Sequence, residues 1–305
     1  MDVVRLPVVC GPTAAGKSAL ALALAETRGM GIISADSRQV YRDFDIGTAK
    51  PTDEERRRVP HEGIDVVAPT ERYSAARWAS GVEGWRAALE SQGRPPLVVG
   101  GTGLYLRALA EPLFEEPPLD PAARRALDRE LQPLPLEELR RRCRVLDPPR
   151  AHLGRTQLLR AIEVATLTGR PISELHRARR RDARYALRYL LVDPGEELHD
   201  RIARRVDAMI AAGWVDEVRR LMQSVPGDAP AWNATGYDTI REVAQGTRSL
   251  AEGRERVIIA TRQYAKRQRT WFRHQLPPAH VVHVNSADPG ALTRALAWCG
   301  EESLR

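Results

Sequence analysis

Short apolar runs alternate with longer amphipathic segments along most of the chain. Apolar runs with the length of buried strands occupy 6–10, 31–36, 96–99, 186–193 and 280–285. Segments with helical spacing occupy 19–26, 74–91, 196–212, 214–222 and 250–272. Strand, helix and strand in this order predict an α/β fold built on a doubly wound parallel sheet with right-handed crossovers.

Residues 119–184 depart from this alternation, because they show helical spacing and no strand pattern. Asp120 and Pro121 begin one helix, and 136–144 and 157–168 have the spacing of short amphipathic helices. Arginine is frequent here, which is typical of a nucleic-acid contact and also of a solvated surface. We therefore expect a core formed by 1–118 and 185–305, interrupted by an all-helical insertion domain at 119–184.

The composition is that of a soluble globular protein, since 29% of the 305 residues are charged and 43% are hydrophobic. No apolar run is long enough to span a bilayer and the N-terminus has no signal-peptide layout, so we expect no membrane association. Cys10, Cys143 and Cys299 lie far apart, which predicts a reducing, cytoplasmic compartment. The net charge of +7 makes a nucleic acid a candidate partner, although an arginine-rich proteome produces the same excess.

The segment Gly11–Ser18 has the G-x-x-x-x-G-K-[ST] spacing of a phosphate-binding loop, or P-loop. It lies between a predicted strand and a predicted helix, which is the context that the motif requires. Backbone N–H groups and the helix N-terminus can hold phosphate oxygens there, and Ser18 can offer a hydroxyl to Mg²⁺. The expected phosphate-binding residues are Gly11, Pro12, Thr13, Ala14, Ala15, Gly16, Lys17 and Ser18.

Polar residues follow two more of the predicted strands. Asp36 ends the run at 31–36, and ligands collect beyond the carboxyl ends of parallel strands, so Asp36 should lie at the same rim as the loop. The polar segment 45–51 either contacts substrate or is a solvated connection. The run at 96–99 ends in Gly100, Gly101 and Thr102 and lacks the acidic residue of a nucleotide hydrolase, which argues against hydrolysis.

Taken together, these segments resemble the tRNA dimethylallyltransferase (isopentenyl transferase) family over almost the whole chain. Many kinases and hydrolases share the loop, so the specific matches are Ser34–Gln39 and Asp45–Pro51. Other matching segments are Val99–Thr102, Arg160–Glu163, Gly236–Tyr237 and Arg262–Gln268 with Trp271. The resemblance is to the bacterial branch of the family.

The resemblance implies transfer of a dimethylallyl group from dimethylallyl diphosphate to N6 of the adenine beside the anticodon, giving i6A in tRNAs that read codons beginning with U. The loop would bind the diphosphate leaving group with Mg²⁺ at Ser18, and Lys17 and Arg205 would stabilise the developing charge. Thr102 would donate to the bridging oxygen, and Asp36 would accept the N6 proton as general base. The implied enzyme is cytoplasmic and monomeric.

The resemblance also implies a set of tRNA-binding residues, because the adenine must leave the anticodon stack to react. Contacts with the base and its neighbours are implied for Asp36, Ser37, Arg38, Gln39 and Thr102. Contacts with the anticodon stem-loop are implied for Arg124, Gln157, Leu158, Leu159, Arg160, Ala161, Asn233, Gly236, Tyr237, Lys266, Arg267, Arg269 and Arg273. The chain departs from the family pattern at Gln157, where arginine is usual, and at Asn233, where a longer side chain is common.

Two other functions are open from the residues alone. A small-molecule or nucleoside kinase that uses ATP would have the same loop on the same kind of sheet. An RNA-binding nucleotide switch without covalent chemistry would need a sensor of the γ-phosphate, and the sequence offers no clear candidate.

Overall fold

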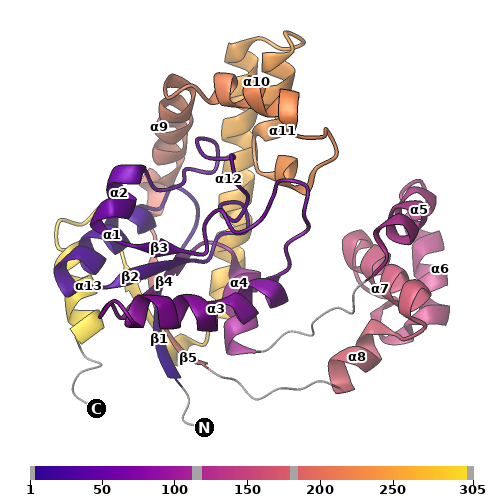
Figure 1. Cartoon of the computed structure of the whole chain (residues 1–305), viewed down its shortest axis with the longest axis horizontal. Helices are drawn as coiled ribbons and strands as arrows, with labels where there is room; N and C mark the ends of the chain where they lie inside the picture. Colours follow the sequence, from indigo (N-terminus) through magenta and orange to yellow (C-terminus); the bar gives the residue numbers. More distant parts are fainter. Residues whose placement is uncertain (1–3, 112–118, 179–184, 301–305) are drawn as a thin grey trace. The chain divides into compact units, whose positions relative to one another are not determined.

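Six parallel strands form one sheet among residues 4–111, 119–178 and 185–300, the ranges that this computed structural model describes (Figure 1). The strands are β1 (Val4–Cys10), β2 (Gly31–Ser34), β3 (His61–Glu62), β4 (Pro96–Gly100), β5 (Tyr185–Val192) and β6 (Val281–Val284). Their order is β3-β2-β4-β1-β5-β6. Strands are therefore added first on one side of β1 and then on the other, which puts the loop after β1 at the switch point where α/β sheets bind ligands.

Helices cover both faces of the sheet, as predicted. On one face, α1 (Lys17–Arg28) and α13 (Ala291–Gly300) pack on alternate strand residues such as Val9 and Ile32. On the other face, α3 (Ala75–Glu90) places Leu89 against Gly31, which shares its face with Ile33. Burial of both faces explains why the strands are continuous apolar runs.

The carboxyl-terminal helices pack around one long helix, α12 (Leu250–Gln275). The helices α9 (Leu198–Ala211) and α11 (Tyr237–Ala244) contact α12, and α10 (Trp214–Ser224) contacts α11 (Figure 1). Ser249 begins α12 in a capping box with Glu252. Because α12 also contacts α4 (Gly103–Ala110), it lies beside the ends of the central strands.

The insertion forms a compact unit of its own. Its helices are α5 (Pro121–Leu131), α6 (Leu136–Leu146), α7 (Arg155–Thr168) and α8 (Ile172–Ala178). They share a core that includes Leu139, Leu158 and Ile162. The chain consists of two compact units. One unit is Glu111–Asp182, and the other combines Met1–Ala110 with Ala183–Arg305. The boundaries predicted at 118/119 and 184/185 fall at the edges of the ranges that the structure describes.

Some short elements have no counterpart in the sequence-based prediction. They are α2 (Asp53–Arg58), β3, α4, α13 and the 3₁₀ turns Pro148–Arg150, Gly195–Glu197, Pro230–Asn233 and Pro278–His280. The helix α4 buries Tyr105, Leu106, Ala108 and Leu109, so it lacks the polar face that makes a helix recognisable by period. None of the helices in the described ranges combines the length and apolar character needed to cross a bilayer.

Candidate active site

The phosphate-binding loop joins β1 to α1 at the carboxyl end of the sheet. Gly16 precedes α1 with φ 85°, a left-handed conformation that a side chain would strain. The ammonium group of Lys17 turns back into the loop and donates to the carbonyl oxygen of Pro12 at 2.6 Å. Ser18 is exposed on the first turn of α1, in a cavity of ≈ 380 Å³. The predicted loop therefore has the helix N-terminus and side chains that an anion site needs.

Two cations lie together beside this loop without an anion to balance them both. Burial and, to a smaller extent, the guanidinium of Arg205 together lower the pKa of Lys17 to about 8. Burial also lowers the pKa of Arg205. Asp36 is the nearby carboxylate that opposes both shifts, and no side chain in the described ranges forms an ion pair with Arg205. An anionic ligand would relieve this repulsion, which makes the pair a candidate site for a phosphate group.

Asp36 follows β2 and presents one free carboxylate oxygen. Its Oδ1 accepts hydrogen bonds from the backbone N–H of Arg38 at 2.8 Å and of Gln39 at 3.4 Å. Within the described part of the chain, Oδ2 has no hydrogen-bond partner. The backbone therefore orients the carboxylate and leaves one oxygen able to accept a proton.

Thr102 lies next to Asp36, at the turn between β4 and α4. Its Oγ1 accepts from the backbone N–H of Ser37 at 3.0 Å and donates to Ser37 Oγ at 3.4 Å. The hydroxyl of Tyr264, on α12, lies near Thr102, and burial raises the pKa of Tyr264 to about 12. Three segments that are distant in sequence thus place one hydroxyl group beside the candidate base.

Two cavities of the core meet at Asp36 and Tyr264, and Thr102 is not among the residues that line either of them. The cavity that holds Lys17 is also lined by apolar residues such as Leu22, Ile32 and Val99. A second cavity of ≈ 260 Å³, here called the Arg267 cavity, is lined by Arg38, Asn233 and Arg267 among others. Both are lined by Thr13, Asp36, Thr48, Arg205 and Tyr264. A reaction between two substrates that enter from different cavities would take place at Asp36.

The segment Asp45–Pro51 lines both cavities, and a buried carboxylate holds it there. Glu217 Oε2 accepts from the backbone N–H groups of Asp45 at 3.0 Å and Ile46 at 2.7 Å. Tyr237 donates to Glu217 Oε1 at 2.7 Å and is fully buried. Its side chain therefore does not have the exposure that the implied tRNA contact would require. Gln39 donates to the carbonyl oxygens of Thr48 and Ala49, so its amide also serves this loop. The choice that the sequence left open is thus resolved in favour of a loop that lines the site.

The basic run of α12 divides between two sides of the helix. Arg267 lines the Arg267 cavity and lies over the ring of Tyr264, and Lys266 is exposed. Arg269 instead forms an ion pair with Asp193, with Nη2 and Oδ1 2.5 Å apart, and it also donates to the carbonyl oxygen of Gly195. Helical spacing therefore separates residues that the sequence grouped together.

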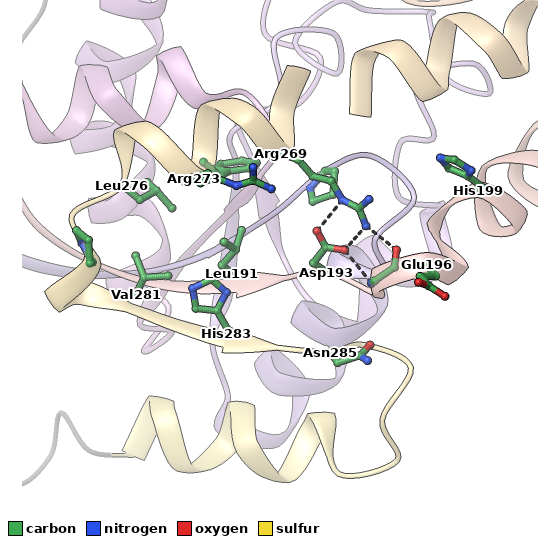
Figure 2. A pocket seen from close by; sticks show the side chains of 14 residues that line it. Leu191, Asp193, Glu196, His199, Arg269, Arg273, Leu276, Val281, His283 and Asn285 are labelled. Atoms are coloured by element: carbon green, nitrogen blue, oxygen red, sulfur yellow. Dashed lines mark hydrogen bonds and ion pairs between the residues drawn. The ribbon is translucent and has the colours of Figure 1, made fainter. Parts of the chain in front are cut away.

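Arg269 and Arg273 line a third cavity, of ≈ 740 Å³, between α12 and the strands β5 and β6. Figure 2 shows the guanidinium of Arg269 directed at Asp193, with Arg273 farther along α12 toward Leu276. This cavity shares Pro12 with the phosphate-binding loop, but neither Lys17 nor Asp36 lines it. The assignment of Arg269 and Arg273 to tRNA contact stays a prediction from sequence.

In the insertion, burial corrects part of the predicted tRNA surface. Leu158 and Ala161 have no exposed area, because they face the core of the insertion, and Leu159 packs against that core. Arg124 and Arg160 both bind the carboxylate of Glu163. Gln157 is exposed but accepts a hydrogen bond from the backbone N–H of Gly154, at the start of α7. The period of an amphipathic helix could have identified the buried positions.

A third set of predicted residues lies at the start of α11. Asn233 is exposed and lines the Arg267 cavity, and its amide donates to the carbonyl oxygen of Pro230 at 3.2 Å. Gly236 has φ 94° and begins α11. Sequence reasoning missed Glu217 and the roles of Tyr264 and Gln268, because each acts through residues far away in the chain.

The division of α12 predicts different effects for two arginines. Arg267→Ala should weaken tRNA binding and reduce the slope of log affinity against log salt concentration by about one, as expected for one lost phosphate contact. Arg269→Ala should change that slope less, because its guanidinium is already paired with Asp193, and it should lower the melting temperature by removing that pair. Filter binding over a salt series measures the first effect and thermal unfolding the second. Equal slopes for Arg267→Ala and the unaltered protein would contradict the prediction.

Comparisons with known proteins agree with the resemblance. A family model described as IPP transferase matches residues 39–275, and one described as isopentenyl transferase matches residues 4–61. The tRNA dimethylallyltransferase of Gloeobacter violaceus is 45% identical over 288 residues, 90% of this chain and 91% of that protein. A tRNA dimethylallyltransferase of Anaeromyxobacter is 45% identical over 289 residues, 91% and 94% of the two chains.

Solved structures show the same relationship. The full-length tRNA isopentenylpyrophosphate transferase of Bacillus halodurans matches with a TM-score of 0.67 at 31% identity, over 98% of this chain and 96% of that chain. A eukaryotic dimethylallyltransferase acting on tRNA matches with a TM-score of 0.80 at 26% identity, over 98% and 79% of the two chains. The resemblance inferred from the motifs is confirmed, and this chain belongs to the IPP transferase family, with bacterial tRNA dimethylallyltransferases among its relatives.

Proposed function

We propose that this chain is a prenyl transferase that moves a dimethylallyl group from dimethylallyl diphosphate to N6 of the adenine beside the anticodon of tRNA. The observation that carries the proposal is the pair Lys17 and Arg205, two half-buried cations near Asp36, where two cavities meet. One cavity combines this cationic end with apolar walls, which fits a diphosphate with a short apolar chain. The Arg267 cavity would admit the adenine. The family relationship favours this function over the ATP-dependent kinase.

The residues of the site can account for the electron pair, the negative charge and the proton of the reaction. The bond between the allylic carbon and the bridging oxygen breaks, and diphosphate leaves with the electron pair. Lys17, Arg205 and the loop N–H groups stabilise the negative charge that grows on its oxygens, and Thr102 donates to the bridging oxygen. The N6 nitrogen bonds to the allylic carbon, and its proton passes to the free Oδ2 of Asp36. The acid form of Asp36 then releases that proton to solvent.

The loop also fits a Mg²⁺ ion bound together with the diphosphate. Magnesium in phosphate sites is held by one or two protein oxygens, substrate oxygens and water. Ser18 supplies a hydroxyl at the first turn of α1, and the described residues contain no group of three or more His, Cys, Asp or Glu that would hold a metal independently. Ser18 would therefore hold the ion with the substrate, and the ion would neutralise part of the diphosphate charge. A monomeric state and a cytoplasmic location remain predictions from sequence.

One experiment tests the proposed function against its alternatives. The protein is incubated with Mg²⁺, labelled dimethylallyl diphosphate and unmodified tRNA that carries adjacent adenines at the 3′ edge of the anticodon. Label should appear in the RNA, on N6 of the adenine beside the anticodon. ATP turnover without transfer of label would favour a kinase instead, and binding of nucleotide and RNA without turnover would favour a switch.

Lys17 predicts a pH dependence for binding of the leaving group. The pKa of Lys17 is about 8 in the free protein, and a bound diphosphate would raise it by supplying an opposite charge. The contribution of Lys17 to the affinity for inorganic diphosphate should thus be full below pH 8 and should fall as pH rises from 8 through the higher pKa of the bound state. Lys17→Arg should flatten this profile, because an arginine stays charged. Calorimetric titration across the range measures both, and a flat profile for the unaltered protein would contradict the assignment.

A further inference from the structure

One buried amide connects the phosphate-binding loop to the turn that carries Thr102. Gln268 on α12 is 7% exposed. Its Oε1 accepts from the backbone N–H of Thr13 at 2.8 Å, and its Nε2 donates to the carbonyl oxygen of Gly101 at 2.8 Å. We propose that Gln268 is a positioning residue for the transfer reaction, which holds the diphosphate site and Thr102 in register. This inference rests on the proposed function.

The two hydrogen bonds require an amide in one orientation. A backbone N–H can only donate and a carbonyl oxygen can only accept, so Oε1 must face Thr13 and Nε2 must face Gly101. A carboxylate could accept from Thr13 but would place a second acceptor against Gly101. A methionine has nearly the same length and would make neither bond.

Close packing around the amide makes the connection tight. A Cβ atom added to Gly101 would lie 2.5 Å from Gln268 Nε2, so glycine is the residue that leaves room for this contact. Gly101 precedes Thr102, which is hydrogen-bonded to Ser37 and lies near Tyr264. Tyr264 and Gln268 are one helical turn apart on α12, so the same turn contacts Thr102 directly and through the backbone.

The function of such a connection is geometric. The charges of Lys17 and Arg205 can attract a diphosphate even if the loop is slightly displaced. Thr102, in contrast, must lie within hydrogen-bond distance of one particular oxygen, the bridging oxygen. Reaction rates fall steeply when groups move by about 1 Å, by up to about 100-fold, although binding changes little. The loss of Gln268 should therefore lower kcat and leave the affinity for diphosphate nearly unchanged.

Two variants test the proposal. In Gln268→Met, kcat for dimethylallyl transfer should fall by about 10- to 100-fold, with little change in the affinity for inorganic diphosphate or for tRNA. In Gln268→Glu, the ratio of its kcat to that of the unaltered protein should rise as pH falls from about 8 to about 6. The protonated carboxyl has an O–H donor and a carbonyl acceptor, which restores the polarity of the amide. Gln268→Met should show no such recovery.

The same substitutions at Gln263 are the control, because Gln263 is exposed on the same helix and should tolerate both. Hydrogen exchange of the peptide that contains Gly11–Ser18, measured without ligand, should be faster in Gln268→Met. That measurement tests the connection even if the chain proves not to transfer a prenyl group. In the background of Thr102→Ala, the kcat effect of Gln268→Met should be smaller than in the unaltered protein.

Any of four results overturns the proposal, and the first three concern exchange, pH dependence and additivity. They are unchanged exchange of the loop, a Gln268→Glu ratio that does not vary with pH, and additive effects of Gln268→Met and Thr102→Ala on kcat. A loss of diphosphate affinity in Gln268→Met as large as its loss of kcat would also overturn it, because Gln268 would then act on binding.

Discussion

Replacing Asp36 with asparagine should lower the rate of dimethylallyl transfer by about 10²- to 10⁴-fold, the usual effect of removing a general base. Asparagine keeps an oxygen that can accept from the N–H groups of Arg38 and Gln39, so the turn after β2 should hold its shape. What it loses is the Oδ2 that would accept the N6 proton. Single-turnover transfer to tRNA measures the effect, and gel-shift binding should show that tRNA affinity is retained.

Asp43→Asn is the matched control, because Asp43 is exposed and the substitution removes the same charge from a nearby loop. It should leave turnover unchanged. If Asp36→Asn retained near-normal turnover, Asp36 would have no role as a base. A parallel loss of tRNA affinity would instead indicate that Asp36 contacts the RNA and that its effect on rate follows from binding.

Replacing Arg205 with methionine should lower turnover by about 10²- to 10³-fold, as the loss of one charge-stabilising group commonly does. The affinity for inorganic diphosphate should fall as well, because the anion then meets one cation instead of two. The stability of the protein without diphosphate should not decrease in the same way. Burial lowers the pKa of Arg205, and Arg205 lowers the pKa of Lys17, so both charges are held at a cost in the empty cavity. The melting temperature of the variant should therefore not fall.

Arg204→Met is the control for this substitution, because Arg204 is the exposed neighbour on α9. It should change neither turnover nor the melting temperature appreciably. A marked loss of stability in Arg205→Met would show that the guanidinium has a structural role, and normal diphosphate affinity would exclude it from the leaving-group site. Adding inorganic diphosphate should stabilise the unaltered protein more than the variant.

Most of the α/β core could be predicted from sequence because its signals are local. The apolar runs of β1, β2, β4, β5 and β6 lie within a few residues of their predicted bounds, and α3 begins after its cap Ser74, at the start of the helical spacing recognised over 74–91. Elements without a contrasting polar face, such as α4, gave no period to recognise. Leu158 and Tyr237 are included among the implied tRNA contacts because they lie in segments that resemble the family. Both side chains are buried, which a match between segments cannot predict.

The phosphate-binding loop, the position of Asp36 after a strand and the family could be recognised from sequence, because each depends on residues that are neighbours in the chain. What stands opposite them depends on the packing of distant segments. The fold brings Arg205 beside Lys17, holds Asp45–Pro51 through Glu217, and gives Arg267, Gln268 and Arg269 of α12 three different surroundings. The physical reason is that helical period shows which residues share a face, whereas packing between distant segments decides what each face meets.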